Sequence, residues 1–263
     1  HKAPTVLKLG QYPAKKKERD PYRKKLRKLT SKAVRYMTED ELRAGTDLAI
    51  LLKDFDQALI LLKQLIKITQ SITVAKIARL EIADITFEIG DLKNAAKYYE
   101  EYIELYPGDK EKVAYACYKG ILSNFYSILP ADRDQTATLK TIELANNFLV
   151  AKNAMFKTYN NEVERIKTTC LSRLWEHDVV IVNFHIKRGS IGSAKICVAD
   201  AREKLLPHIP GIERNMLECD YKIALAEKNT TLALKISQDL SMRFPQSPVV
   251  ASTKKPTNFA TRF

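Results

Sequence analysis

The sequence is poor in glycine and has no long hydrophobic run, and each shortage excludes a class of protein. Only 8 of the 263 residues are glycine, whereas 45% are hydrophobic. This balance supplies a large core but few of the tight turns that an all-β fold needs. The longest apolar runs, such as residues 179–182, stop far short of the ~20 residues of a membrane-spanning helix. The composition predicts an all-α protein without a transmembrane helix.

Residues suited to catalysis or metal binding are sparse. The four cysteines lie far apart and match neither a zinc-binding pattern nor a disulfide framework, so we interpret them as core residues, with a chance disulfide as the alternative in an oxidising compartment. They are Cys117, Cys170, Cys197 and Cys219. His177 and His185 are two helical turns apart, too far for one metal without further ligands. We predict no metal, no cofactor and no enzymatic activity.

Acidic residues are scarce at the N-terminus, where the positive charge is concentrated. Residues 1–35 hold 13 Lys and Arg against Glu18 and Asp20, a net charge of +11 out of +13 for the whole chain. The rest of the sequence is nearly neutral. We therefore treat residues 1–37 as a separate basic arm or linker.

The most informative pattern is an internal repeat. Four segments share a polar turn and a small residue five positions later. The small residues are Ala58, Ala95, Ala194 and Ala233. Their intervals of 37, 99 and 39 residues leave room for a fifth, longer unit in the middle gap. A helix, a tight turn and a second helix whose alanine permits close approach is the layout of a tetratricopeptide repeat.

The repeat predicts an all-α, right-handed superhelical solenoid of about five tetratricopeptide-type hairpins. Thr38 and Glu41 form a T-x-x-E capping box that should begin the first helix after the arm. The repeat domain is expected over 38–250, followed by a tail at 251–263. The repeats are expected at about 38–70, 71–108, 109–158, 159–208 and 209–247.

Two features depart from an ordinary repeat array. The third repeat joins its helices through "SILPADRDQTATLK" (127–140), which crowds Asp132, Arg133 and Asp134 together. The plain interpretation is a solvated loop in which Asp134 caps the next helix. The fourth repeat carries a continuous pattern from about Asn161 to Lys187. A helix of that length should contact both the preceding and the following repeat.

These landmarks, taken in order, resemble a known family. "YYEEYIELYP", "AYACYKGIL", the "DRDQT" loop, "LWEHDVVIVNFHIKRGSIGSAKICVADAREKL" and "RFPQSPV" follow one another between about Asp40 and Val250. In this order they are similar to the BamD-like outer-membrane β-barrel assembly lipoproteins, which are built from tetratricopeptide repeats. The arm is more basic than the short linker of that family, and the lipid-accepting cysteine would have to lie upstream of His1.

The resemblance implies a non-catalytic scaffold at the periplasmic face of the bacterial outer membrane, tethered by lipid. Its C-terminal repeats would bind a periplasmic domain of a BamA-like barrel subunit. Its N-terminal repeats would receive unfolded outer-membrane proteins, and the other lipoproteins of the complex would be further partners. The alternative is a generic repeat adaptor whose basic arm binds nucleic acid or an anionic membrane. A cell-envelope repeat protein that regulates enzymes or associates with peptidoglycan is a third possibility.

Candidate binding residues follow from the chemistry of each surface. Arginine suits interfacial carboxylates, so we expect the partner to contact Asp132, Arg133, Asp134 and Arg188. For Arg188 the alternative is a cation that satisfies the end of its own helix. Substrate contacts are expected at Arg43, Arg79 and Phe87.

The basic arm has three interpretations: a tether that contacts anionic lipid, a plain linker, or a nucleic-acid-binding segment. We rank nucleic acid last and do not expect it as a partner, because the arm has no evident aromatic platform for stacking bases. Each cation near an anionic membrane contributes ~1 kcal/mol. The membrane contacts would be Lys15, Lys16, Lys17, Lys24 and Lys25.

Overall fold

Helices make up most of the part that the computed structural model describes, residues 16–151 and 154–248. No β-strand occurs in those residues, which confirms the all-α prediction. None of their helices is long and apolar enough to cross a membrane. The main helices are α1 (Lys16–Thr30), α2 (Glu39–Leu51), α3 (Phe55–Ile68), α4 (Ile72–Glu88), α5 (Leu92–Leu105), α6 (Lys110–Tyr126), α7 (Thr136–Leu149), α8 (Asn160–Lys187), α9 (Ile191–Lys204), α10 (Glu213–Ala226) and α11 (Thr230–Arg243).

Four of the helical hairpins share one turn geometry. The turn residue is left-handed in each, with φ of 57° at Lys53, 83° at Gly90, 74° at Gly189 and 59° at Lys228. The next residue donates its N–H back to the fifth residue before it, as Asp91 does to the Thr86 carbonyl at 3.1 Å. Such a bond satisfies carbonyls that the helix end leaves unpaired. The polar turn of the sequence repeat is therefore a helix-terminating motif.

The alanine five residues after each turn is buried. Ala58, Ala95 and Ala194 have no exposed surface, and Ala233 is 4% exposed. Each lies on the second helix of its hairpin, where a small side chain permits the first helix to pack closely. The repeat found in the sequence is thus a packing requirement.

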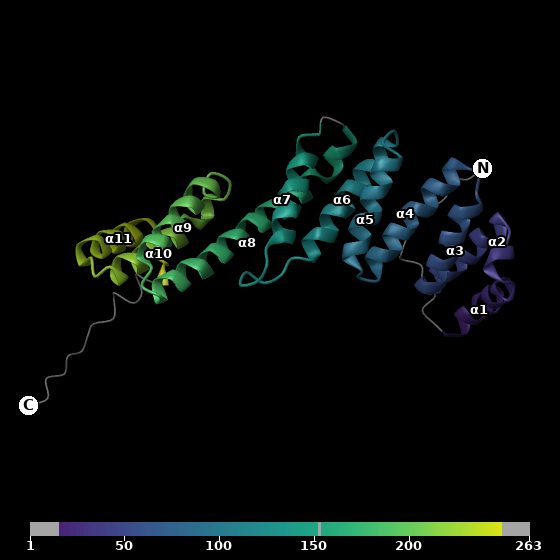
Figure 1. The fold of residues 1–263 in the computed structure, drawn as a ribbon, viewed down its shortest axis with the longest axis horizontal. Coiled ribbons are helices and arrows are strands. Elements are labelled where there is room, and N and C mark those ends of the chain that lie inside the picture. The colour runs from purple at the N-terminus through teal and green to yellow at the C-terminus, as the bar shows by residue number, and fades with distance from the viewer. Residues whose placement is uncertain (1–15, 152–153, 249–263) are drawn as a thin grey trace, which may run out of the picture. The chain divides into compact units, whose positions relative to one another are not determined.

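The chain divides into two compact units, which are described separately. Unit 1 contains α1 to α6, and consecutive helices in it pack side by side from α1 to α2 and onward to α6 (Figure 1). Unit 2 contains α7 to α11, again with each helix packed on the next. The predicted third hairpin is distributed between them, because α6 packs on α5 in unit 1 and α7 packs on α8 in unit 2.

The long helix predicted in the fourth repeat is present. α8 runs over 28 residues and contacts α7, α9 and α10 (Figure 1). Trp175 and Val182 lie in its buried face, and Met216 of α10 joins the same core cluster. The expectation that this helix contacts both neighbouring repeats is confirmed within unit 2.

The basic segment before the first repeat is folded in its described part. α1 packs on α2, and its Leu26 is only 6% exposed within the core cluster of unit 1. Leu29 packs against the same cluster. An extended, fully solvated linker does not describe these residues, because two leucines spaced three apart lie on one face of the helix and bury against the repeats.

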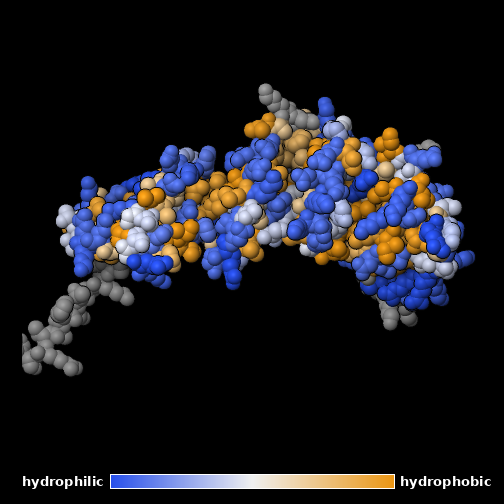
Figure 2. Space-filling view, in the orientation of Figure 1, coloured by the Kyte–Doolittle hydropathy of each residue, from blue (hydrophilic) through white to orange (hydrophobic). Residues whose placement is uncertain are grey.

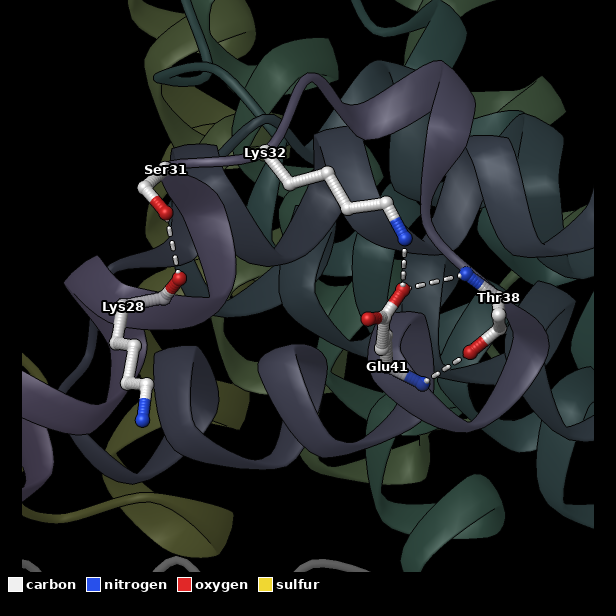
Figure 3. A network of polar contacts seen from close by, with 5 residues as sticks. All are labelled: Lys28, Ser31, Lys32, Thr38 and Glu41. Carbon is white, nitrogen blue, oxygen red and sulfur yellow. Dashed lines mark hydrogen bonds and ion pairs between the residues drawn. The ribbon is translucent and has the colours of Figure 1, made fainter.

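The predicted capping box is also present and anchors this junction. The Thr38 hydroxyl accepts from the Glu41 N–H at 3.3 Å, while the Glu41 carboxylate accepts from the Thr38 N–H at 2.8 Å. Lys32 donates to the same carboxylate at 2.9 Å (Figure 3). One carboxylate thus begins α2 and joins it to the residues that follow α1.

All four cysteines are free. Cys170 and Cys219 are buried, as the core interpretation predicts, whereas Cys117 and Cys197 are half-buried. Burial raises the pKa of the Cys117, Cys170 and Cys219 thiols to about 11, so these sulfurs stay protonated and unreactive at neutral pH.

Candidate functional site

The first candidate surface is the loop between α6 and α7, here called the charged loop (residues 128–135). Asp132, Arg133 and Asp134 are all exposed. Asp134 accepts hydrogen bonds from the Thr136 N–H at 3.3 Å and hydroxyl at 2.9 Å, so it stabilises the start of α7. No hydrogen bond or ion pair of the Arg133 guanidinium occurs among the described residues. The loop therefore exposes to solvent a cation, Arg133, that has no partner among the described residues.

Two residues that the sequence did not single out for this role fix the charged loop. The buried Gln135 amide donates to the Pro130 and Arg133 carbonyls at 2.9 and 3.0 Å, and its oxygen accepts from Thr138. His177 of α8 contacts the Ala131 carbonyl through Nδ1 at 2.5 Å. Because a carbonyl only accepts, Nδ1 must carry the hydrogen. Both ends of the loop are thereby held in place.

Arg188 occupies the C-cap of α8. Its guanidinium makes no hydrogen bond to a helix-end carbonyl among the described residues, and its contact with a partner stays a prediction. Its backbone N–H donates to the Phe184 carbonyl at 3.1 Å. Its guanidinium lies over the Phe184 ring at 5.4 Å, and that ring is 51% exposed. No carboxylate pairs with Arg188 among the described residues. The result is an exposed cation stacked on an exposed aromatic ring, a combination enriched at protein interfaces.

The second candidate surface lies on unit 1 and is here called the polar lane. It consists of Arg43, Glu81, Asp84, Phe87, Tyr99, Tyr115 and Lys119. Arg43 forms a bidentate pair with Glu81, with both N···O distances at 2.7 Å, and lies 3.2 Å from Asp47. The carboxylate that pairs with Arg43 thus belongs to the same chain and not to a substrate. Burial raises the pKa of Glu81 even though Arg43 opposes the shift. The pair joins α2 to α4.

The polar lane continues to Asp84, which lies between two tyrosines. The Asp84 carboxylate accepts from the hydroxyls of Tyr99 at 2.6 Å and Tyr115 at 2.9 Å. Burial raises the pKa of Asp84, although both tyrosine hydrogen bonds act against the shift. The same carboxylate thus joins α4, α5 and α6. Its role is to connect three consecutive helices.

Phe87 lies at the end of the polar lane beside a cation. The Lys119 ammonium is 3.5 Å from the centroid of the Phe87 ring. Burial lowers the pKa of Lys119, and Lys119 has no ion pair among the described residues. Phe87 also contacts Tyr126, whose ring lies 6.1 Å away and is 58% exposed. Phe87, Tyr126 and Lys119 therefore form a partly exposed patch of two aromatic rings and one cation that a bound peptide can contact.

Arg79 lies apart from the polar lane. It is two positions before Glu81 on α4, which places the two side chains roughly 200° apart around the helix. There it lines a pocket of about 300 Å³ between α3, α4 and α5. The three residues expected to contact substrate therefore fall on two surfaces: Arg43 and Phe87 on the polar lane, and Arg79 in the pocket.

The expected membrane contacts fall on and before α1. Lys24 and Lys25 are exposed on the helix, and Figure 2 shows hydrophilic residues gathered over α1. Lys15 lies outside the described residues, as do the side chains of Lys16 and Lys17. In the described part of the chain, no group of three or more His, Cys, Asp or Glu could hold a metal ion.

Comparison with known proteins gives one result that bears on these surfaces. The family model described as "YfiO: Outer membrane lipoprotein" matches residues 38–214, from the capping box of α2 to the start of α10. A search of curated proteins found no match. The match covers more than half of the sequence and includes the polar lane and the charged loop, and it confirms the resemblance to BamD-like lipoproteins. The chain therefore belongs to the YfiO family of outer membrane lipoproteins.

Proposed function

We propose that this protein is a non-catalytic scaffold of the outer-membrane β-barrel assembly complex. Unit 2 docks a periplasmic domain of a BamA-like barrel subunit, and unit 1 receives unfolded outer-membrane proteins. Other lipoproteins of the complex are further partners. Its family places the protein at the outer membrane. The observation that carries the proposal is the charged loop, which is held at both ends and presents Arg133 with no partner among the described residues.

Docking on unit 2 is supported by a shared feature of Arg133 and Arg188. Both are exposed, and neither is paired with a carboxylate among the described residues. A surface arginine without a partner keeps all of its donors for a bidentate contact with a carboxylate of another protein. Because the charged loop is already fixed by Gln135, binding requires little further ordering of the chain. Asp132 and Asp134 add exposed acceptors beside Arg133.

Substrate binding on unit 1 is assigned to the aromatic end of the polar lane. Phe87, Tyr126 and Lys119 offer ring faces and one cation to an extended segment that carries apolar and acidic side chains. Arg43 contributes indirectly, because its guanidinium already holds Glu81. Its proposed role is to fix α2 against α4 behind the binding residues.

Membrane contact is assigned to α1. Lys24 and Lys25 are exposed cations on a helix that is packed on unit 1. Each of them contributes ~1 kcal/mol when it lies close to anionic head groups. Vesicle sedimentation tests this assignment: Lys24→Gln together with Lys25→Gln should weaken binding to anionic vesicles and leave neutral vesicles unaffected. Equal binding of the variant and the parent protein to anionic vesicles would contradict it.

The docking proposal is tested by charge reversal. Arg133→Glu should weaken binding to the purified periplasmic domains of the barrel subunit at least tenfold, measured by biolayer interferometry at low salt. Lys235→Glu is the matched control, because Lys235 is an exposed cation of unit 2 on α11. It should leave binding unchanged, and neither variant should shift thermal unfolding. No binding by the parent protein, or equal losses in both variants, would refute the proposal.

A further inference from the structure

The pocket that contains Arg79, here called the cationic pocket, is rich in donors and poor in acceptors. Lys63 and Lys67 of α3 and Arg79 of α4 line it, and Glu101 of α5 is its one acidic residue. None of these three cations forms an ion pair within the described residues. Glu101 lies 3.9 Å from Lys97, which belongs to its own helix. The pocket therefore holds more positive charge than the protein itself neutralises.

Arg79 supplies the second observation. Its Nε is buried and has no hydrogen-bond partner in the described part of the chain. A buried donor without an acceptor costs about 1–3 kcal/mol, and native proteins rarely contain one without a reason. An acceptor brought into the pocket by a ligand would remove this cost. The guanidinium thus lines a pocket in which an anion would satisfy this donor.

Unit 2 contains a pocket in the equivalent place, and it differs in one respect. Both pockets lie between the second helices of two consecutive hairpins, and in unit 2 these are α9 and α11. There the two cations are neutralised internally: Lys195 pairs with Glu227, and Arg202 pairs with Asp220, each at 2.5 Å. A pocket at this place in the repeat can therefore have its cations paired within the chain, and the three cations of the cationic pocket differ from that arrangement.

The walls of the cationic pocket are apolar. Ile66, Ile82 and Tyr98 line it, and Ile82 is 6% exposed. Ile72 lies two turns before Arg79 on the same side of α4 and is 72% exposed. An exposed apolar side chain therefore lies on the face of α4 that carries Arg79. A ligand that fits must join a compact anion to a hydrophobic body.

Phosphate suits three cations better than carboxylate does. A carboxylate has two coplanar oxygens, which one arginine fork engages together, as Arg43 and Glu81 illustrate. A phosphate group offers more acceptor oxygens in several directions, and lysine binds it as a point charge. We propose that the cationic pocket binds the phosphate group of an amphiphile, with its alkyl or acyl chain on the apolar wall.

The experiment is isothermal titration of the full chain with dihexanoyl phosphatidylglycerol kept below its micelle concentration. Saturable binding to the parent protein is expected, with binding at least tenfold weaker for Lys63→Gln with Lys67→Gln and for Arg79→Gln. Dihexanoyl phosphatidylcholine and inorganic phosphate, offered alone, should each bind at least tenfold more weakly than the glycerol lipid. Nuclear magnetic resonance should show a shift of the Arg79 Nε–H signal on binding.

Two control variants separate this site from the rest of the molecule. Lys195→Gln with Arg202→Gln alters the equivalent pocket of unit 2 and should leave binding unchanged. Lys93→Gln removes an exposed cation of α5 and should also leave it unchanged. The vesicle test of Lys24 and Lys25 concerns other residues, so failure of the membrane assignment and failure of this inference are distinguishable. Circular dichroism confirms that each variant is folded.

Four results of this titration would overturn the inference, and a fifth result comes from a peptide. They are no binding by the parent protein, equal binding of the phosphatidylcholine, equal binding of inorganic phosphate, and losses in a control variant as large as those in the pocket variants. Tighter binding of an amphipathic glutamate-rich peptide that Arg79→Gln abolishes would also overturn it, because the pocket would then be a peptide site.

Discussion

Arg43 of unit 1 differs from Arg133 and Arg188 of unit 2 in what its guanidinium group holds. Arg43 in unit 1 forms two hydrogen bonds to Glu81 and a further ion pair with Asp47. Arg133 and Arg188 in unit 2 have no carboxylate partner among the described residues. The same residue type therefore serves structure at Arg43 and remains available for binding at Arg133 and Arg188. The difference depends on whether an acidic residue of the same chain lies opposite.

Removing Arg43 should have the largest effect on stability. Arg43→Ala leaves Glu81, whose side chain is only 13% exposed, without its partner, which should cost about 2–3 kcal/mol. Urea denaturation monitored by circular dichroism measures the loss. Replacing the pair together, Arg43→Met with Glu81→Leu, should cost less than Arg43→Ala alone. Arg133→Ala should change stability by less than about 0.5 kcal/mol. If Arg43→Ala and Arg133→Ala lower the free energy of unfolding equally, the contrast between a paired Arg43 and an unpaired Arg133 fails.

Gln135→Ala should have the next largest effect and acts on unit 2. The buried amide makes three hydrogen bonds that hold the charged loop, and their loss should cost about 1–2 kcal/mol. Faster amide exchange in residues 128–135 is the direct readout. Partner binding should weaken even though Gln135 is buried. Unchanged exchange in this loop would show that something other than the Gln135 side chain fixes it.

The left-handed turns predict a pair of opposite effects of about 1 kcal/mol. Gly90→Ala should destabilise unit 1 by about this amount, because a Cβ is disfavoured at φ of 83°. Lys228→Gly should stabilise unit 2 by up to the same amount, because it relieves a lysine at φ of 59°. Thermal unfolding of each variant tests the signs. Destabilisation by Lys228→Gly would mean that the lysine side chain contributes more than its strain costs.

The smallest effect concerns pH and the polar lane. Burial raises the pKa of Asp84 above its ordinary value of 3.8, so the folded state binds this proton more tightly than the unfolded state does. Stability from this group is therefore present at low pH and is lost as pH rises from about 3.8 through the folded pKa. Asp84→Asn keeps an acceptor for Tyr99 and Tyr115 and removes the titration.

The matching measurement is chemical denaturation of Asp84→Asn and the parent protein between pH 3.5 and 7. The stability of the variant relative to the parent should increase with pH over this range and then level off. Tyr36→Phe is a suitable control, because Tyr36 is 62% exposed and lies outside the polar lane. A difference that decreases with rising pH would reverse the sign and contradict the assigned cause.

The repeat positions were predictable because they are set by local chemistry. A left-handed turn followed by a small residue five positions later leaves the same trace in the sequence at Lys53, Gly90, Gly189 and Lys228. The capping box of Thr38 and Glu41 is likewise contained within four residues. The helical state of α1 was missed, because eight cations in fifteen residues hide the few leucines that give it a buried face.

The partners of each charged side chain were not predictable in the same way. Arg43 and Glu81 are 38 residues apart, and their contact depends on how two hairpins stack. His177 and Ala131 are 46 residues apart, so no local pattern indicated that a histidine of α8 holds the charged loop. Arg79 and Phe87 share one helix, yet they serve different surfaces. Such pairings depend on tertiary geometry and carry no local pattern.

Hydrogen exchange measured on the complex with the periplasmic domains of the barrel subunit tests the central claim most directly. The account predicts slower exchange on binding in residues 128–135 and 184–190 of unit 2, with α2 and α4 of unit 1 unchanged. Arg133→Glu should abolish this protection at the same protein concentrations. Protection confined to unit 1, with none in the charged loop, would contradict the account.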